Sequence, residues 1–434
     1  MTRPRRFRRL LMLVVALAMV AASCGDTGSE DTTTTTGDSG ATTTEAPTDT
    51  TEGGDGTTTT AMEPDEPLVF GMILVGPQND RGWSQAHHEA GLYLEEQLGA
   101  EMITLDKVNT ADRPDTTVDQ VVSDMIDQGA QLVFMTSDDM KDGAFAAATA
   151  HPDVPMVWSS GDNAWEDGMD YRPDLANLAN SMGKMIYGKM IAGCAAALTT
   201  QTGEISYLGP LINDETRRLV NSAYLGARYC WEEVRGNPAA DLGFEVNWIG
   251  FWFNIPGVTL DPTEVSTAFF DGGSDVVISG IDTTEALVVA SQRAEAGDEV
   301  WAVPYDYEGA CEEAPEICLG VPYFNWRPDY LRIAQSVQDG TFTNDFNWNA
   351  PDWNDINNLE TSAVGWVSGE GLSDEASTEL DAFIAGLADG SINLFTGPLN
   401  YQDGTEWLAE GEEATEVQIW YTTQLLEGVE GPSS

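Results

Sequence analysis

Aromatic side chains recur near the ends of predicted strands, and this residue type suits ligand binding better than bond making. Trp83, Trp252 and Trp326 each follow a predicted strand or lie in a turn. An indole ring can stack on a flat ligand, and its π face attracts a cation. Each Trp could instead pack inside a hydrophobic core, and Phe251 or Phe253 could take the place of Trp252 in its loop.

Polar residues follow other predicted strands. Ser137, Asp138, Gly161 and Asp306 stand at or just beyond carboxyl ends, where ligands bind in open parallel sheets. A carboxylate can accept hydrogen bonds from two hydroxyl or amine groups at once. Either aspartate could instead cap a following helix. We expect both of them to contact a ligand.

No set of catalytic residues stands out in the chain. It contains no GxSxG, HExxH or Walker motif, and no GxGxxG after a strand. His87 and His88 are adjacent on a predicted helix, where neighbours face different directions, so we interpret both as surface residues. With 72 Asp and Glu, any chosen pair for glycoside hydrolysis is uninformative. We therefore predict a binding protein without enzymatic activity, cofactor or metal.

The cysteines predict disulfides. Cys194, Cys230, Cys311 and Cys318 remain besides Cys24, and an even number outside the cytoplasm indicates bridges. Three pairings are possible, of which we favour Cys311–Cys318, across a short acidic loop, together with Cys194–Cys230. A metal site is the alternative, but there are only three His and no CxxC.

The N-terminus is predicted to be a leader and a tether. A basic segment precedes the apolar run 10–22, and Ala21–Cys24 resembles a bacterial lipobox, in which the cysteine is lipidated. The signal peptide would be residues 1–23, and an uncleaved anchor or an ordinary signal peptide is the alternative. Residues 24–66 are rich in Thr, Gly and acids and predict a disordered tether. No later stretch reaches the roughly 18 apolar residues of a membrane span.

The chain is strongly acidic, with a formal net charge of −53. Such a surface repels nucleic acid and anionic lipid, so neither is an expected partner apart from a lipid anchor.

The stretch 68–99 reads as strand, loop and helix. Leu68–Val75 is an almost unbroken apolar run, as in a strand buried on both faces, and apolar residues then recur at helical spacing up to Gly99. An ordinary βα connection with a core Trp is the simplest alternative. Similar βα units follow in two series of comparable size. This pattern predicts an α/β fold of two doubly wound parallel-sheet lobes joined by a hinge.

The predicted lobes exchange segments along the chain. The expected boundaries are residues 67–177 with 306–340 for lobe 1, 178–305 with 341–397 for lobe 2, and a C-terminal segment 398–434.

The loop that follows the first strand resembles the first binding loop of the basic membrane protein (BMP) family. These are substrate-binding lipoproteins of ABC importers, with a type I periplasmic binding-protein fold. The family positions are occupied here by Asp80, Trp83, Ser84, Gln85 and Gly91. The C-terminus resembles the family at Phe395, Gly397, Pro398, Asp403, Gly404, Gly428, Val429 and Gly431. The resemblance runs from about Leu68 to Gly431.

The resemblance also implies roles for single residues, since several relatives bind purine nucleosides. Asp306 would accept sugar hydroxyls, and Asp138 would contact the base. Trp83 and Trp252 fall where relatives place two stacking rings. A small ring-containing ligand, nucleosides first, would thus lie between the lobes.

One departure from the family concerns charge. Nucleoside-binding relatives carry a Lys soon after the strand equivalent to 319–321. Here the segment GVPYFNWRPDY has Asn325 and Trp326 in that neighbourhood and no Lys. The cleft is therefore expected to lack its usual cation and to take a neutral or cationic ligand.

Taken together, these features predict a monomeric, lipid-anchored protein on the extracytoplasmic face of the cell membrane. It would deliver a small molecule to the permease and ATPase subunits of an ABC importer. A ligand sensor of the same fold is the first alternative, and a secreted hydrolase is the second.

Overall fold

The computed structural model describes residues 66–434, in which β-strands and helices alternate along most of the chain. The predicted leader 1–23, the lipidation site Cys24 and the tether, apart from Glu66, lie outside the described residues. Within the described part, no helix is both long and apolar enough to cross a membrane.

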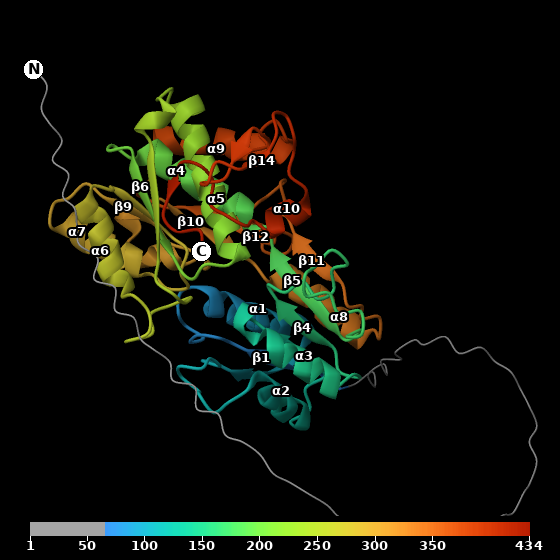
Figure 1. Cartoon of the computed structure of the whole chain (residues 1–434). Helices are drawn as coiled ribbons and strands as arrows, with labels where there is room; N and C mark the ends of the chain where they lie inside the picture. The colour runs from blue at the N-terminus through green and yellow to red at the C-terminus, as the bar shows by residue number, and fades with distance from the viewer. Residues whose placement is uncertain (1–65) are drawn as a thin grey trace, which may run out of the picture. The chain divides into compact units, whose positions relative to one another are not determined.

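The first lobe is built on a six-stranded parallel sheet with the order β11-β5-β4-β3-β1-β2. The strands are β1 (Val69–Ile73), β2 (Glu101–Leu105), β3 (Leu132–Met135), β4 (Met156–Ser159), β5 (Leu178–Gly183) and β11 (Phe346–Asn349). Helices α1 (Trp83–Leu98), α2 (Val118–Asp127), α3 (Lys141–Ala150) and α8 (Arg327–Gln338) pack around it (Figure 1).

Local signals explain where the helices of this lobe begin and end. Thr117 and Gln120 form a capping box at the start of α2. Gly99 ends α1 in a left-handed conformation, and its N–H donates to the carbonyl of Glu95, as the sequence predicts. The strands β3 and β4 are buried throughout, which fits their unbroken apolar runs.

The second lobe contains a five-stranded parallel sheet with the order β15-β7-β6-β8-β9. Its strands are β6 (Glu204–Gly209), β7 (Gly243–Trp248), β8 (Val276–Ser279), β9 (Trp301–Val303) and β15 (Val429–Glu430). Its helices are α4 (Met185–Thr199), α5 (Asp214–Tyr229), α6 (Pro262–Gly272), α7 (Glu285–Glu295), α9 (Asp374–Asp389) and α10 (Glu416–Trp420).

Alternation along the strands separates two cores in this lobe. Val276 and Ile278 of β8 belong to the larger core, which includes α4 and α5. Val277, between them, belongs to the smaller core under α6 and α7. Successive side chains of a strand point to opposite faces, so the sheet carries a helical layer on each side.

The remaining strands form two antiparallel pairs: β10 (Gly320–Phe324) with β12 (Val364–Ser368), and β13 (Leu399–Asn400) with β14 (Glu406–Leu408). Parallel bridges from Ala302 to Cys318 and from Asp306 to Tyr323 attach β10 to the edge of the second sheet.

The chain crosses between the lobes after β5, after β10 and after β11, and this differs from the predicted boundaries. β5 and β11 come from stretches expected in lobe 2 but belong to the first sheet. The stretch 306–324, expected in lobe 1, joins the second. From the sequence pattern, each strand is placed in the same lobe as the helix that follows it. At a crossover, the strand and the next helix pack in different lobes.

Two disulfides brace the second lobe, in the pairing that the sequence favoured. Cys194 of α4 is joined to Cys230 at the end of α5, and Cys311 is joined to Cys318 in the loop before β10.

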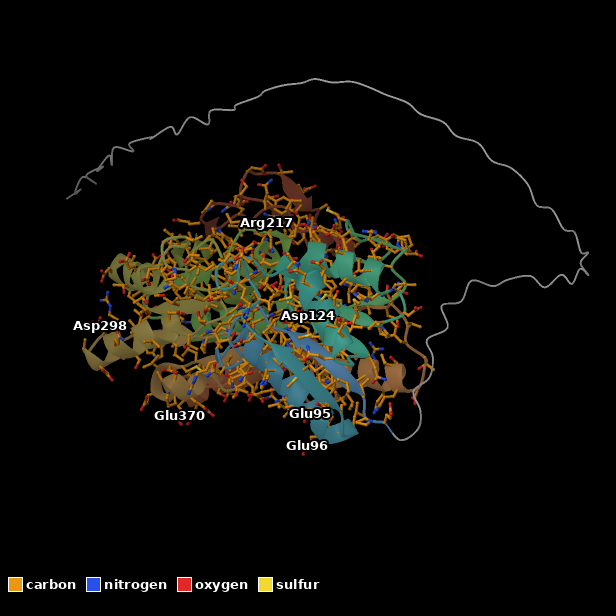
Figure 2. The ribbon with its side chains drawn as sticks, turned by 90° about the horizontal axis from the view of Figure 1, so that it is seen from below. Glu95, Glu96, Asp124, Arg217, Asp298 and Glu370 are labelled. Atoms are coloured by element: carbon orange, nitrogen blue, oxygen red, sulfur yellow. A yellow bond between two sulfur atoms is a disulfide. The ribbon has the colours of Figure 1, made fainter. Side chains whose placement is uncertain are left out.

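Four exposed acidic side chains, those of Glu96, Asp124, Asp298 and Glu370, are labelled in the view from below (Figure 2).

Candidate ligand-binding site

A cavity lies between the two lobes. Its walls come from the carboxyl ends of parallel strands, the place where open α/β sheets bind ligands. The first lobe contributes Val75, Trp83, Ser137, Asp138 and Ser160, and the second lobe contributes Tyr207, Pro210, Glu215, Thr216, Leu219, Trp252, Gly280, Asp282 and Tyr305. Four of the predicted site residues line it: Trp83, Ser137, Asp138 and Trp252.

The ring of Trp83 is held firmly in the first lobe. It opens helix α1 and is 8% exposed. Its indole N–H donates to the carbonyl of Thr136 at 2.5 Å. Phe324 and Trp326 pack edge-on against it, each with ring centroids 5.2 Å away. The ring therefore forms a fixed wall of the cavity rather than an adaptable one.

Trp252 stands on the loop that follows β7 in the second lobe. Its carbonyl accepts a hydrogen bond from the N–H of Asp282 at 2.9 Å, which ties the loop to the end of β8. The indole nitrogen is buried and has no partner within the described chain. Phe251, an alternative from the sequence, lines a separate groove beside α2 and α3. Trp252 is thus the residue of this loop that reaches the cavity.

Three carboxyl groups line the cavity, and sequence reasoning found only Asp138. Glu215 lies in the first turn of α5, and Asp282 follows β8. Burial raises the pKa of Asp138 above its usual range, although Lys141 and Arg218 oppose the shift. Burial raises the pKa of Glu215 to about 7. Burial, with repulsion from Asp306, also holds the pKa of Asp282 well above its usual value.

Asp306 is fully buried near the cavity but is not one of its lining residues. Both carboxylate oxygens lack a hydrogen-bond partner among residues 66–434. Its backbone is left-handed, with φ of 71°, a strained conformation for a residue other than Gly. Burial raises its pKa well above the usual range, and Lys189 opposes the shift.

Lys189 lies behind the wall of the cavity and is not among the residues that line it. This residue of α4 is fully buried, and its Nζ donates to the carbonyl of Ser279 at 2.6 Å. The same Nζ lies 3.2 Å from the ring centroid of Tyr305, which lines the cavity. Burial lowers the pKa of Lys189 well below its usual value, while Asp306 opposes the change. Lys189 thus faces Asp306 from a helix that is distant in sequence from the segment 319–326.

Asp80 and Ser84 support the first loop rather than line the cavity. The carboxylate of Asp80 accepts hydrogen bonds from the N–H groups of Gly82, Ser84 and Gln85. The hydroxyl of Ser84 accepts one from the N–H of Gly76 at 2.9 Å. Burial raises the pKa of Asp80 to about 6, although these hydrogen bonds oppose the shift. Both residues hold the loop that presents Trp83.

The other predicted residues take different positions. Asn325 lies at the second crossover, where its amide donates to the carbonyls of Leu359 and Ser362 at 2.9 and 2.7 Å. Trp326 lies behind Trp83, and its indole nitrogen has no partner among the described residues. Gly161 lines a chamber that adjoins the cavity. Asn325 and Trp326 therefore support the residues that line the cavity and do not line it themselves.

His87 is buried, so its interpretation as a surface residue is wrong. Its Nδ1 is 2.7 Å from the hydroxyl of Tyr330, which is also 2.8 Å from the hydroxyl of Ser159. Its ring stacks on Trp326 at 4.1 Å. Burial lowers the pKa of His87 well below its usual value. The signal was present in the sequence, because His87 follows Trp83 by four residues and shares its helix face.

Comparisons with known proteins agree with this geometry. Residues 68–342 match the model of a protein family described as ABC transporter substrate-binding protein PnrA-like. A purine-binding protein of Brucella abortus is 27% identical, over 85% of this chain and 95% of that protein. A putative ABC transporter glucose-binding protein of Haloferax volcanii is 25% identical, over 83% of this chain and 79% of that protein.

Solved structures share the fold at low sequence identity. A solute-binding protein of an ABC transporter system from Aeropyrum pernix matches with a TM-score of 0.60 and 11% identity, over 75% of this chain and 93% of that chain. A similar protein from Conexibacter woesei matches with a TM-score of 0.53 and 18% identity, over 75% of this chain and 98% of that chain.

Proposed function

Since the chain belongs to the family of PnrA-like ABC transporter substrate-binding proteins, we propose that it carries a small ring-containing molecule to an importer. The ligand binds between the lobes, is neutral or cationic, and is released without chemical change. A nucleoside is the first candidate, and other aromatic or hydroxylated heterocycles come next. Lipidation of Cys24 holds the protein at the extracytoplasmic face of the membrane, where it acts as a monomer.

One observation carries the ligand class: an indole from each lobe and three carboxyl groups line one cavity. Trp83 and Trp252 supply flat apolar surfaces, which favour a ring between them. The carboxyl groups of Asp138, Glu215 and Asp282 accept hydrogen bonds, which favours a ligand with several hydroxyl or amine donors. No Lys, Arg or His is among the residues that line this cavity. An anionic ligand would meet like charges there without a direct partner.

The purine-binding relative from Brucella abortus supports the same ligand class. Its similarity covers both lobes, since it extends over 370 residues. The buried pair Asp306 and Lys189 adds to the proposal, because the two unpaired carboxylate oxygens of Asp306 are suited to accept sugar hydroxyls. Asp306 directly follows Tyr305, which lines the cavity, so a small conformational change would bring the Asp306 carboxyl group to the ligand.

The test is to identify the bound molecule. Protein purified under native conditions is denatured, and the released small molecules are identified by mass spectrometry. Calorimetry on the stripped protein then measures affinity for that molecule and for a panel of purine and pyrimidine nucleosides. We expect a nucleoside or a related heterocycle to bind and to be recovered unchanged. A released anionic compound, or binding of sugars with no heterocycle, would contradict the proposal.

A further inference from the structure

Two carboxylates from opposite lobes face the same space and have no partner among the described residues 66–434. Asp138 follows β3 of the first lobe, and Glu215 lies in the first turn of α5 of the second. Both line the cavity, and both also line an adjoining chamber. Neither carboxylate forms a hydrogen bond or an ion pair with another side chain or with the backbone of residues 66–434.

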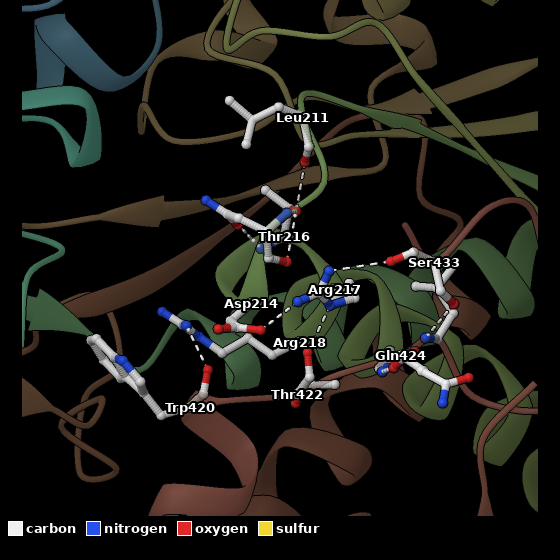
Figure 3. A network of polar contacts seen from close by, with 12 residues as sticks. Leu211, Asp214, Thr216, Arg217, Arg218, Trp420, Thr422, Gln424 and Ser433 are labelled. Atoms are coloured by element: carbon white, nitrogen blue, oxygen red, sulfur yellow. Dashed lines mark hydrogen bonds and ion pairs between the residues drawn. The ribbon is translucent and has the colours of Figure 1, made fainter. Parts of the chain in front are cut away.

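The nearby cations are engaged elsewhere. Arg218, one turn beyond Glu215, donates to the carbonyl of Trp420 at 3.2 Å, and its guanidinium lies 4.3 Å from the centroid of the Trp420 ring (Figure 3). Lys141, one turn beyond Asp138, pairs with Asp170 at 3.2 Å. Each cation favours the ionised form of a nearby acid through its charge, but neither forms an ion pair with Asp138 or Glu215.

A buried acid in the same cavity points to the missing partner. Asp282 is 4% exposed and lines the cavity, and its carboxylate forms no hydrogen bond with the described residues. A buried carboxylate without a hydrogen-bond partner is costly, so native proteins normally satisfy such a group. Among residues 66–434, no hydrogen bond joins the carboxyl group of any of these three cavity-lining acids to the protein, and a ligand that carries positive charge would supply a partner.

We propose that Asp138 and Glu215 together bind a positively charged nitrogen of the ligand, and that this contact joins the two lobes. The inference rests on the proposed function and narrows it to organic cations that contain a flat ring. A quaternary or protonated nitrogen attached to the ring would lie between the two carboxylates. The ring itself would meet Trp83 and Trp252, which also attract a cation through their π faces.

The arrangement has a consequence for lobe closure. Without a ligand, closing brings Glu215 toward Asp138, and like charges in a water-poor space repel each other. The other charged groups that face Glu215 are Arg218 on its own helix and the acids Asp282 and Asp306 at the ends of neighbouring strands. Acids outnumber cations in this set, so the bound cation is the group that favours the closed state.

The first experiment compares two ligands that differ in charge. Adenosine is neutral at pH 7, and 1-methyladenosine is a cation of nearly the same shape. We expect calorimetry to show that the wild-type protein prefers 1-methyladenosine by about tenfold to a hundredfold, the range for hydrogen bonds to charged groups. Glu215→Gln keeps the shape of the side chain and should abolish most of this preference. Glu233→Gln serves as the matched control, because Glu233 is exposed in the helical turn that directly follows α5.

The second experiment needs no ligand. Small-angle X-ray scattering at pH 8, where Glu215 is mostly ionised, measures the radius of gyration of the stripped protein. Glu215→Gln should shift the free protein toward the compact, closed form, and Glu233→Gln should not. If neither nucleoside binds, the proposed ligand class is wrong, and the scattering result alone decides the charge inference. Equal binding of the two nucleosides, or an unchanged radius of gyration in Glu215→Gln, would overturn the inference.

Discussion

Gly82 of the first lobe lies directly against the backbone of Asp282 in the second. A Cβ atom placed on Gly82 would be 1.7 Å from the carbonyl oxygen of Asp282, far inside van der Waals contact. The conformation of Gly82 has a negative φ of −147°, so the close approach of the two lobes, rather than a left-handed backbone, requires glycine here. Arg81, beside it, pairs with Glu313 of the second lobe at 3.3 Å.

We predict that Gly82→Ala prevents the lobes from closing fully. The added methyl group forces Asp282 away, so the closed state becomes less populated, and apparent affinity falls in proportion to that population. Calorimetry with the ligand that co-purifies should show a loss of about tenfold or more. Gly272→Ala is the control, because a Cβ there has open space around it. Wild-type affinity in Gly82→Ala would show that the contact does not limit closure.

The two tryptophans of the cavity should respond differently to truncation. Trp252 is half-buried on a loop, so Trp252→Ala should lower affinity at least tenfold, from stacking of about 1 kcal/mol plus lost buried area, with little loss of stability. Trp83 is packed by Phe324 and Trp326, so Trp83→Ala should also cost about 3–5 kcal/mol of unfolding free energy. Urea titration and calorimetry separate the two effects. Unchanged affinity in both folded variants would place the ligand elsewhere.

Asp306→Asn should weaken binding while the fold persists. Asn tolerates the left-handed backbone found at this position. The substitution removes the charge that faces Lys189, and we expect an affinity loss of about 1.5–3 kcal/mol, the range for hydrogen bonds to charged groups. Asp298→Asn, at an exposed site, controls for net charge. Equal calorimetric affinities in these two variants would mean that Asp306 has a structural role only.

The two disulfides should differ in their contribution to stability. Loop closure predicts about 4 kcal/mol for Cys194–Cys230, and about 2–3 kcal/mol for Cys311–Cys318, because the second bridge closes a much shorter loop. The sequence separations are 36 and 7 residues. Denaturant unfolding of the two double Cys→Ser variants measures both values. A larger loss from the short loop than from the long one would contradict this order.

Lipidation is tested at Cys24. Cys24→Ser should release the protein from the membrane fraction, since no helix of residues 66–434 can span a membrane. Fractionation and immunoblotting follow the protein, and mass spectrometry of the wild-type N-terminus detects the lipid. A Ser variant that stays membrane-bound and unprocessed would show that the leader itself is the anchor.

Part of the site followed from the sequence, because it depends on local order. A residue just beyond a buried apolar strand lies at the carboxyl edge of a parallel sheet, and this rule placed Trp83, Ser137, Asp138 and Trp252 at the cavity. The same rule applies to Asp282, which follows β8. Glu215 gave a weaker signal, since an acid in the first turn of a helix is common for reasons of helix dipole alone.

By itself, the sequence determined the βα alternation, the two-lobed α/β class and the family, since apolar periodicity and loop motifs are local properties. Only the tertiary structure decided which lobe receives β5 and β11, because the pairing of these two strands within the first sheet joins residues more than 150 positions apart. It alone brought Lys189 to Asp306, and Glu215 to the cavity that Asp138 lines. The burial of His87 also depended on a partner, Tyr330, from a distant helix. Charge balance in a closed cleft is a property of the assembled lobes, so no single stretch of the chain contains it.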